Sequence, residues 1–316
     1  MIVLGAGVIG IEYTCIFAAL GIEVTLVNTR RELLPFLDRE IADVLEQEMH
    51  RLGVVVLHDD HYAKIEKVGG KKPRVRCTTR KGNLLEADVM LYCVGRDGNT
   101  KDLGMENIGI EPNKRGLLEV NEFYQTKHPH IYAVGDIIGY PALASTSMAQ
   151  GRQAVRHALN LPGIREETSV FPAAIFSIPE VSSIGENERT LEKAGKSYIV
   201  GRGHYALNAR GQILSDTGGL LKLLFHAETQ KLLGVHIVGT DACELISTGH
   251  AYMRLNATAE DIANGIFNYP SLSDLYRHAA LEALADFDHK KKGEPRTSLD
   301  EHYYLQSPQA AITKVR

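Results

Sequence analysis

Short apolar runs alternate with amphipathic segments along the first 95 residues of the chain. The apolar runs have the length of strands, and from Asp38 the apolar residues recur at steps of three and four, as on one face of a helix. The pattern predicts strands at 2–4, 23–27, 54–57 and 89–94, helices ending near Leu20 and Gly53, and a hairpin within 63–87. This alternation predicts a doubly wound, Rossmann-like α/β domain over residues 1–95.

The pattern changes after residue 95. Residues 96–165 begin with a polar loop rich in Asn and Gly, followed by a predicted strand at 131–134 and a predicted helix at 145–159. Residues 166–289 mix strands and helices and predict a C-terminal α+β domain. The charged tail at 290–316 has no periodicity, so we expect it to be disordered.

Charge and hydropathy exclude two classes of partner. Lys and Arg number 35 against 39 Asp and Glu, a net charge of −4, which argues against a nucleic-acid partner. The apolar runs are far shorter than the roughly 20 residues that a helix needs to cross a bilayer. We therefore expect no membrane span.

Cysteine and histidine spacing bears on redox chemistry, metal binding and location. The four cysteines are scattered without CxxC spacing and three of them lie in apolar runs, which favours buried thiols over a redox pair. Met1 leads into the first strand without a basic leader, so we expect no signal peptide and a cytoplasmic protein. The 13 histidines show no metal-ligand spacing, and no metal site is predicted.

A glycine motif follows the first predicted strand and opens the first helix. Gly5, Gly7 and Gly10 form GxGxxG. The first glycine permits a tight turn, the second lets a pyrophosphate approach the backbone, and the third lets helix and strand pack closely. Because the helix N-terminus then faces the anion, this context favours a dinucleotide site over a simple packing turn.

The end of the second strand bears on coenzyme preference. An NAD-specific site places an acid there, whereas this chain has neutral Asn28, followed by Arg30 and Arg31. Asn28 would not repel a 2′-phosphate, and an arginine could pair with it through two hydrogen bonds. The alternative is that both arginines are solvated surface charges. We expect NADP to be admitted without NAD being excluded.

Taken in order, three motifs resemble those of the FAD-dependent pyridine nucleotide-disulfide oxidoreductases of class I. They are GxGxxGxE, which ends at Glu12, the strand that ends in Gly95-Arg96, and the segment from Tyr132 to Gly135-Asp136. The resemblance implies that the first motif binds NAD(P) and that Asp136 hydrogen-bonds the ribitol of FAD. It also implies that the helix opening at Ala144 faces the pyrimidine edge of the flavin, where a positive helix end favours negative charge. By themselves, the residues would also allow Asp136 to be a helix cap.

The resemblance also assigns domains and an activity. It implies that 1–95 is the NAD(P)-binding domain, that 96–165 is the C-terminal part of an FAD-binding domain, and that 166–289 forms the dimer of a homodimeric protein. Within the family, segments such as 27–30 and 134–141 are most similar to the soluble pyridine nucleotide transhydrogenases. This implies FAD-dependent transfer of hydride between NADPH and NAD⁺. That chemistry requires no nucleophilic side chain, so no catalytic residue is assigned.

Two departures from the family pattern leave alternative functions open. Disulfide reductases carry His-Pro where this chain has Tyr269-Pro270, and a tyrosine, with a pKa near 10, is a poor proton shuttle at neutral pH. The family's first glycine motif, which holds the FAD pyrophosphate, would lie before Met1, so the resemblance implies an N-terminally truncated chain. The alternatives are an inactive NAD(P)-binding and dimerising module and a dihydrolipoamide dehydrogenase-like flavoprotein.

Overall fold

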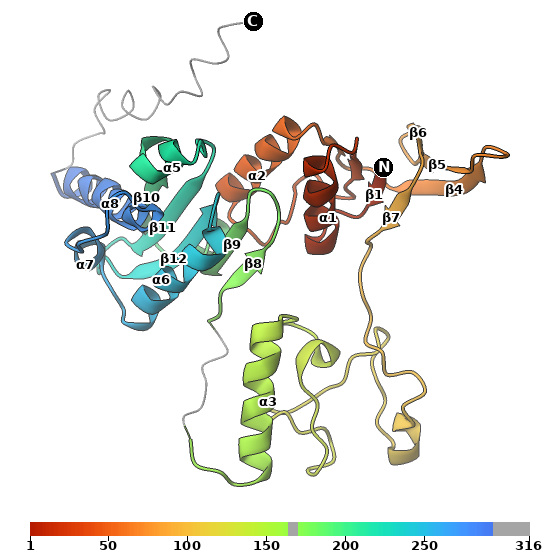
Figure 1. Cartoon of the computed structure of the whole chain (residues 1–316). Helices are drawn as coiled ribbons and strands as arrows, with labels where there is room; N and C mark the ends of the chain where they lie inside the picture. Colours follow the sequence, from red (N-terminus) through yellow and green to blue (C-terminus); the bar gives the residue numbers. More distant parts are fainter. Residues whose placement is uncertain (164–169, 293–316) are drawn as a thin grey trace, which may run out of the picture. The chain divides into compact units, whose positions relative to one another are not determined.

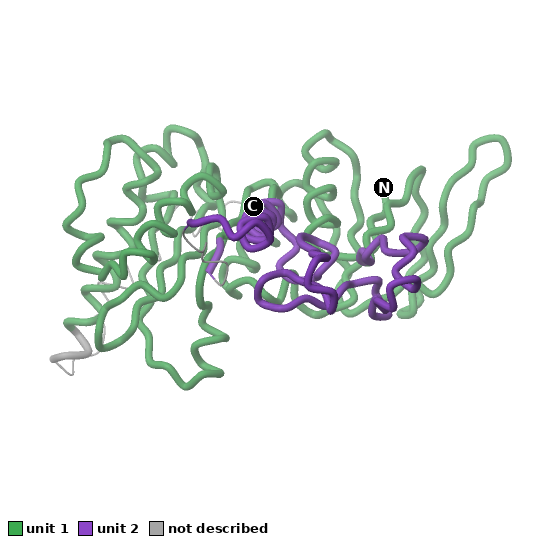
Figure 2. Tube along the Cα trace, turned by 90° about the horizontal axis from the view of Figure 1, so that it is seen from below, with its two compact units in different colours: residues 1–94, 172–316 green, residues 95–171 purple. Residues whose placement is uncertain are grey.

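The computed structural model describes residues 1–163 and 170–292, with side chains described as far as residue 288. Contacts divide the chain into two compact units (Figure 2), one of which combines residues 1–94 with the described residues from 172 onward. The other unit is 95–171. The predicted tail lies outside the described residues except for 290–292, which are helical. No helix among the described residues is long and apolar enough to cross a membrane.

A four-stranded parallel sheet forms the N-terminal part of the first unit (Figure 1). Its strand order is β3-β2-β1-β7, and the predicted α/β domain is confirmed. The strands are β1 (Ile2–Leu4), β2 (Thr25–Val27), β3 (Val55–Leu57) and β7 (Met90–Tyr92), and the helices are α1 (Val8–Ala19) and α2 (Arg39–Arg51).

The two faces of this sheet have different covers. Alternate residues of a strand point to opposite faces, so Val3 packs in one core with Ile11 of α1 and Leu45 of α2. Ile2 instead packs in a second core with Cys77. That cysteine belongs to an antiparallel meander of β4 (Tyr62–Val68), β5 (Arg74–Thr79) and β6 (Leu84–Ala87). The predicted hairpin is therefore two strands of a three-stranded sheet that covers the face away from α1 and α2.

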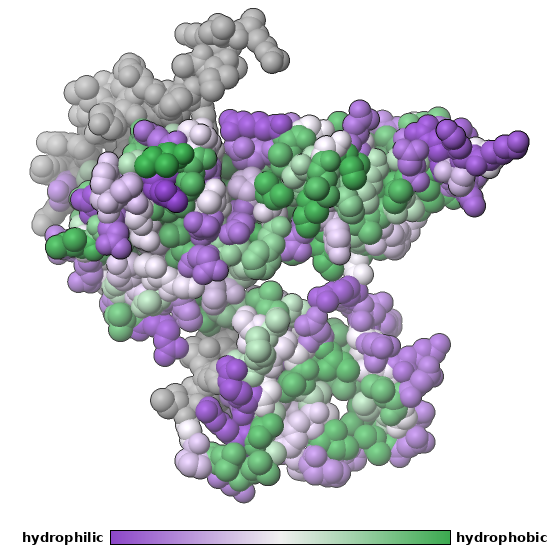
Figure 3. Space-filling view, viewed as in Figure 1, coloured by the Kyte–Doolittle hydropathy of each residue, from purple (hydrophilic) through white to green (hydrophobic). Residues whose placement is uncertain are grey.

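Surface hydropathy differs between two parts of this domain. The far end of the β4–β5 hairpin is hydrophilic, whereas apolar side chains gather over α1 (Figure 3). Ile9, Tyr13, Ile16 and Leu20 are exposed there. Helix α1 is thus apolar on its outer face as well as on the face that packs against β1.

A five-stranded antiparallel sheet, in the order β10-β11-β12-β9-β8, forms the C-terminal part of the first unit and confirms the predicted α+β domain. Its core joins the central strands to α6 and α8 through buried residues such as Phe225, Ile246 and Tyr276. The strands are β8 (Ala173–Ile175), β9 (Val181–Gly185), β10 (Tyr198–His204), β11 (Leu220–His226) and β12 (Leu232–Val238). The helices are α4 (Glu188–Lys193), α5 (Ala209–Ile213), α6 (Ala242–Arg254), α7 (Ala259–Ala263) and α8 (Leu275–Lys292).

The second unit contains one long helix, α3 (Ala144–Ala158), and a small core around Leu118 and Ala133. The predicted strand at 131–134 is wrong, because this segment forms only an isolated bridge between Tyr132 and Gln125. A strand needs a hydrogen-bonded ladder along its length, and the described residues of this unit contain no β-strand.

A buried ion cluster joins the parallel-sheet domain to the antiparallel sheet. Lys222 of β11 is fully buried, and its Nζ lies 2.8 Å from Asp38 Oδ1 and 2.9 Å from Glu40 Oε2 and also contacts Glu188. Asp38 also accepts the N–H of Glu40 as the N-cap of α2. The three carboxylates converge as cation ligands would, and the lysine ammonium fills that place.

Lys222→Met tests how much this ion cluster contributes to the stability of the fold. The substitution leaves the buried carboxylate of Asp38 without its counter-charge, so we expect a loss of about 3–5 kcal/mol in the free energy of unfolding. Urea unfolding followed by circular dichroism measures it. Lys193→Met, on the exposed face of α4, is the control. A loss no larger than the control's would contradict the prediction.

Acid should weaken the same cluster through Glu40. Burial alone would raise the pKa of Glu40, but the hydrogen bond from Arg202 and the charge of Lys222 outweigh it and lower this pKa from 4.5 to about 2. An acid with a lowered folded pKa adds stability that is present above its unfolded pKa and is lost as the pH falls through its folded pKa. The contribution of Glu40 is therefore lost between pH 4.5 and about 2.

We expect Glu40→Gln to be less stable than the wild type at about pH 7 and to lose less stability on acidification to about pH 3. Urea midpoints at the two pH values measure the difference. Exposed Glu228→Gln should follow the wild type at both. Parallel pH profiles for the wild type and Glu40→Gln would refute this role of Glu40.

Candidate dinucleotide-binding site

The turn after β1 brings helix α1 against the strand end. Gly5 has φ +100°, and a Cβ there would lie 2.4 Å from the carbonyl oxygen of Cys93. A Cβ on Gly10 would lie 1.9 Å from the carbonyl oxygen of Gly5. Any side chain at either position would collide with backbone, so both glycines are needed for the close packing of strand and helix.

Gly7 differs from these two glycines because its Cα faces open space. A Cβ there would meet nothing within 4 Å, and the residue is exposed at the N-cap of α1. The first N–H groups of a helix have no intrahelical acceptor. No side chain caps this end, and the first turn holds no acid. The arrangement therefore offers backbone donors and a positive helix end to an anion at Gly7.

Asn28 lies beneath the turn that follows β2. Its side chain is buried, and its Nδ2 donates to the carbonyl of Glu32 (3.0 Å) and lies 3.1 Å from Nδ1 of His58. Its Oδ1 accepts the N–H of Arg30 (3.2 Å). The polar atoms of Asn28 are thus engaged within the chain, and the residue shapes the turn from below.

Arg30 and Arg31 lie on the outer side of the same turn. Both are exposed, and neither forms an ion pair with a carboxylate among the residues that the structure describes. The turn is next to the glycine motif, because the N–H of Gly5 donates to the carbonyl of Val27 (3.1 Å). Two free guanidinium groups therefore stand beside the strand end that carries Gly5.

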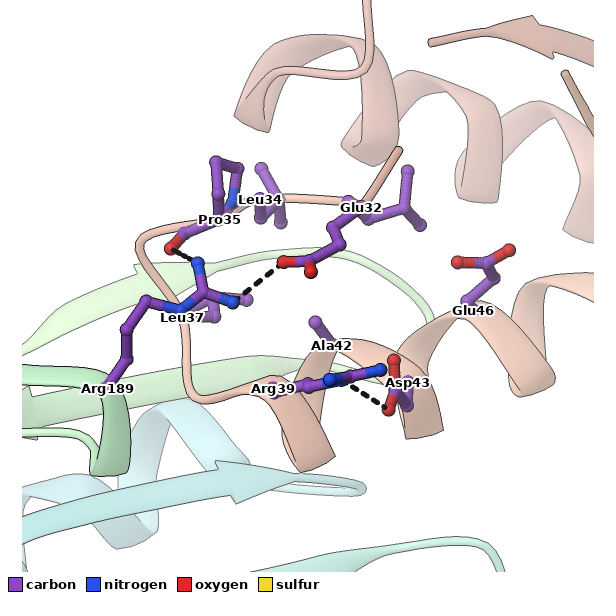
Figure 4. A pocket seen from close by; sticks show the side chains of 10 residues that line it. Glu32, Leu34, Pro35, Leu37, Arg39, Ala42, Asp43, Glu46 and Arg189 are labelled. Atoms are coloured by element: carbon purple, nitrogen blue, oxygen red, sulfur yellow. Dashed lines mark hydrogen bonds and ion pairs between the residues drawn. The ribbon is translucent and has the colours of Figure 1, made fainter. Parts of the chain in front are cut away.

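The loop that continues from this turn is held by the antiparallel-sheet domain (Figure 4). Arg189 of α4 donates to the Glu32 carboxylate (2.7 Å) and to the carbonyl of Pro35 (2.9 Å). The hydrogen bond and charge of Arg189 hold the pKa of Glu32 below its usual value. The cavity between the loop and α2 is about 10 Å³, which is room for one water molecule at most. It is the underside of the loop rather than a coenzyme site.

Two other predicted cofactor residues lie at junctions of the chain. Glu12 of α1 accepts the N–H of Phe176 (2.9 Å), which ties this helix to the segment after β8. Gly95 follows β7 and is exposed as the first residue of the second unit. The positions of Glu12 and Gly95 do not show whether either residue contacts a coenzyme, so both assignments stay predictions.

Asp136 and the N-terminus of α3 belong to the second unit. The Asp136 carboxylate lies 2.9 Å from the guanidinium of Arg96, and both side chains are about half exposed. Gln150 of α3 accepts the N–H of Gly135 (2.7 Å), which fixes the segment carrying Asp136 to the helix. Exposed Ala144 opens α3, whose first turn holds no acid and no side-chain cap. One unit therefore offers an accessible carboxylate and a positive helix end.

Sequence reasoning missed two residues of the first unit. His58 follows β3 and contacts Asn28 through Nδ1, while its Nε2 lies 2.7 Å from Oε1 of Glu46 on α2. No spacing or motif links these positions. The parallel pairing of β2 with β3 brings His58 to Asn28, and the packing of α2 against the sheet brings Glu46 to His58.

Comparison with known families gives two matches. Residues 1–151 match the family described as pyridine nucleotide-disulphide oxidoreductase. Residues 171–280 match the dimerisation domain of the same family. The two matches include the glycine motif, Asp136 and most of the antiparallel-sheet domain.

Curated relatives share this extent of similarity. The chain is 46% identical over 288 residues to the soluble pyridine nucleotide transhydrogenase of Hahella chejuensis. It is 45% identical over 287 residues to that of Chromohalobacter salexigens. Each alignment covers 90% of this chain but 61% of the relative, so the chain spans about three fifths of their length.

Solved structures show a similar fold. LpdA of Mycobacterium tuberculosis is 29% identical with a TM-score of 0.80, over 89% of this chain and 60% of that one. RclA of Escherichia coli, a HOCl-induced flavoprotein disulfide reductase, is 28% identical with a TM-score of 0.82. That similarity covers 89% of this chain and 64% of RclA.

Alanine at two glycines should separate packing from ligand access. We expect Gly10→Ala to lower the thermal midpoint strongly, because its methyl group would overlap the Gly5 carbonyl oxygen. Gly7→Ala should leave the midpoint within a few degrees of the wild type, since its methyl group enters open space. Circular dichroism melts measure both. Equal midpoints for the two variants would contradict the packing described for this turn.

Proposed function

Because the chain belongs to the pyridine nucleotide-disulphide oxidoreductase family, we propose that it takes part in FAD-dependent transfer of hydride between NADPH and NAD⁺. The observation that carries this proposal is the turn at Gly7, with its open backbone, its uncapped helix end and two nearby exposed arginines. The relatives named soluble pyridine nucleotide transhydrogenases support the choice of reaction.

The first unit would hold the nicotinamide coenzyme. Its diphosphate would bind the N–H groups at the start of α1, next to Gly7, where the helix end favours negative charge. Arg30 and Arg31 would pair with the 2′-phosphate of NADPH. The turn carries no acid that would require a free 2′-hydroxyl, and NADH could bind through the same diphosphate contacts. An enzyme that exchanges hydride between the two coenzymes needs this tolerance.

Residues of the second unit fit part of a flavin. Asp136 is accessible and would accept a hydrogen bond from a ribitol hydroxyl, while the contact with Arg96 orients this carboxylate. The α3 N-terminus, which starts at Ala144, would favour negative charge at the pyrimidine edge. The flavin, when bound, would supply the hydride chemistry itself. The sequence contains one GxGxxG motif, which we assign to the nicotinamide coenzyme, so these residues do not account for the FAD pyrophosphate.

The segment around Tyr269 favours hydride transfer alone over thiol exchange. Tyr269 is exposed and offers no imidazole. Five residues on, buried Asp274 accepts a hydrogen bond from Arg277 (2.8 Å) and pairs with His278 (3.2 Å). Burial alone would raise the pKa of Asp274, but these two partners lower it. Its carboxylate is thus engaged by the first turn of α8, the helix that follows it, and is not left to assist a proton carrier. This disfavours a dihydrolipoamide dehydrogenase-like activity.

We also propose a homodimer and a cytoplasmic location. The match of residues 171–280 to a dimerisation domain supports the dimer. Light scattering of the purified chain should give twice the mass of one chain, and a monomer would refute the assembly.

The second candidate function is a module that binds NAD(P) and dimerises without holding FAD. The two candidate functions differ in whether the purified chain retains FAD, which its visible spectrum measures.

The central test is hydride transfer by the purified chain. With FAD added, NADPH should reduce thio-NAD⁺, and the transfer should be followed by absorbance. Gly7→Ala should weaken NADPH binding at least about tenfold, roughly 1.4 kcal/mol, because its methyl group enters the diphosphate space.

Three outcomes are distinct in this test. Coenzyme binding with hydride transfer supports the enzyme. Coenzyme binding with neither hydride transfer nor a visible flavin spectrum supports the module. Failure to bind either coenzyme would refute both. Gly70→Ala, in the exposed turn between β4 and β5 with no atom within 4 Å of its Cβ and no positive φ, is the control for added methyl groups.

A further inference from the structure

The turn that carries the two arginines is clamped by the turn that follows β3. The N–H of Asn28 donates to the carbonyl of Leu57 (2.8 Å), and the N–H of Asp60 donates back to the carbonyl of Asn28 (3.1 Å). The carbonyl of Arg30 accepts from the N–H of Asp59 (3.1 Å). The backbone of Arg30 is therefore held at its N–H by Asn28 and at its carbonyl by Asp59.

The hydrogen bonds of Asn28 define the role of His58. Because Oδ1 of Asn28 accepts from Arg30, its Nδ2 faces Glu32 and His58. One hydrogen of Nδ2 goes to the Glu32 carbonyl and the other to Nδ1 of His58, which must accept. The proton of the neutral imidazole then lies on Nε2 and is donated to Glu46 (2.7 Å).

Because these side chains are largely buried, losing one of their hydrogen bonds is energetically costly. Asn28 is only 3% exposed, so an Nδ2 hydrogen without an acceptor would be costly. The side chains of His58 and Glu46 are about three-quarters buried. A second imidazole, that of His50, lies 3.6 Å from Glu46 but bonds to the carbonyl of Val54 rather than to Asn28.

We propose that His58, held by Glu46, is a positioning residue that sets the preference for a coenzyme with a 2′-phosphate. It acts through Asn28, whose side chain fixes the backbone of Arg30. Without the acceptor on His58 the turn loses one of its anchors, and the guanidinium groups are no longer pre-organised for the phosphate. NADH has an uncharged 2′-hydroxyl there instead of the phosphate. This inference rests on the proposed binding of NADPH beside Gly7.

Two amide variants of His58 separate its two hydrogen bonds. The side-chain oxygen of Asn can take the place of Nδ1, whereas the side-chain nitrogen of Gln can take the place of Nε2. His58→Asn should therefore keep the acceptor for Asn28, and His58→Gln should keep only the donor to Glu46. His50→Gln is the matched control, since His50 is also near Glu46 but does not contact Asn28.

Calorimetric titration of the full chain with NADPH and with NADH gives the readout. We expect His58→Gln to raise the Kd for NADPH about tenfold, the effect of one lost hydrogen bond to a buried donor, and to leave NADH within about twofold. His58→Asn and His50→Gln should keep the wild-type ratio of the two Kd values. Glu46→Ala should lower the preference for NADPH about threefold, because the imidazole loses its anchor.

The outcomes distinguish this inference from the function on which it rests. An unchanged ratio in His58→Gln, or an equal loss of both coenzymes, overturns the positioning role. If His58→Gln does not fold, the ratio in Glu46→Ala decides in the same way. A wild type that binds neither coenzyme, or NADPH binding that survives Arg30→Ala combined with Arg31→Ala, refutes the proposed 2′-phosphate contacts. In either of those cases the inference falls for a reason unrelated to His58.

Discussion

The backbones of Gly5 and Gly10 lie against each other, and the candidate coenzyme site depends on that contact. It leaves no room for a Cβ on Gly10 and so holds the first turn of α1 at the end of β1. The same turn joins β2, because the N–H of Gly5 donates to the carbonyl of Val27. The helix end that we propose for a diphosphate and the turn that we propose for the ribose are therefore fixed to one short stretch of parallel sheet.

The ribose side of the site is held from three directions. The turn after β3 binds the backbone of Asn28 and Arg30, and His58 binds the side chain of Asn28. Farther along the loop, Arg189 of the antiparallel-sheet domain binds Glu32. Buried Lys222 then holds Asp38 at the start of α2. The loop between β2 and α2 is thus anchored at both ends, while the exposed guanidinium groups of Arg30 and Arg31 form no ion pair within the described part of the chain.

Local patterns allowed much of this fold to be predicted from the sequence. The glycine motif and the apolar spacing of α2 act within a few residues, and the structure places both helices where the pattern predicts them. The strand predicted at 131–134 was wrong because Ala133 packs in a small core and the segment pairs with the chain only at the isolated bridge of Tyr132 with Gln125. Apolar spacing alone does not show whether a ladder partner is present.

The candidate site was predictable where it depends on backbone and not where it depends on distant side chains. The roles of Gly5 and Gly10 follow from a motif whose steric reason is local. Asn28 was predicted for its missing charge, whereas the structure shows that its amide organises the turn. Its partner His58 lies 30 residues away, and Lys222 lies 184 residues from Asp38. Such pairs depend on strand order and domain packing, which carry no short-range signal.

A crystal structure of the chain with bound NADP⁺ would test the central claim most directly. The diphosphate should lie within hydrogen-bonding distance of the first N–H groups of α1, beside Gly7, with the 2′-phosphate against Arg30 or Arg31. A coenzyme bound elsewhere, or a diphosphate away from this helix end, would contradict the assignment of the site.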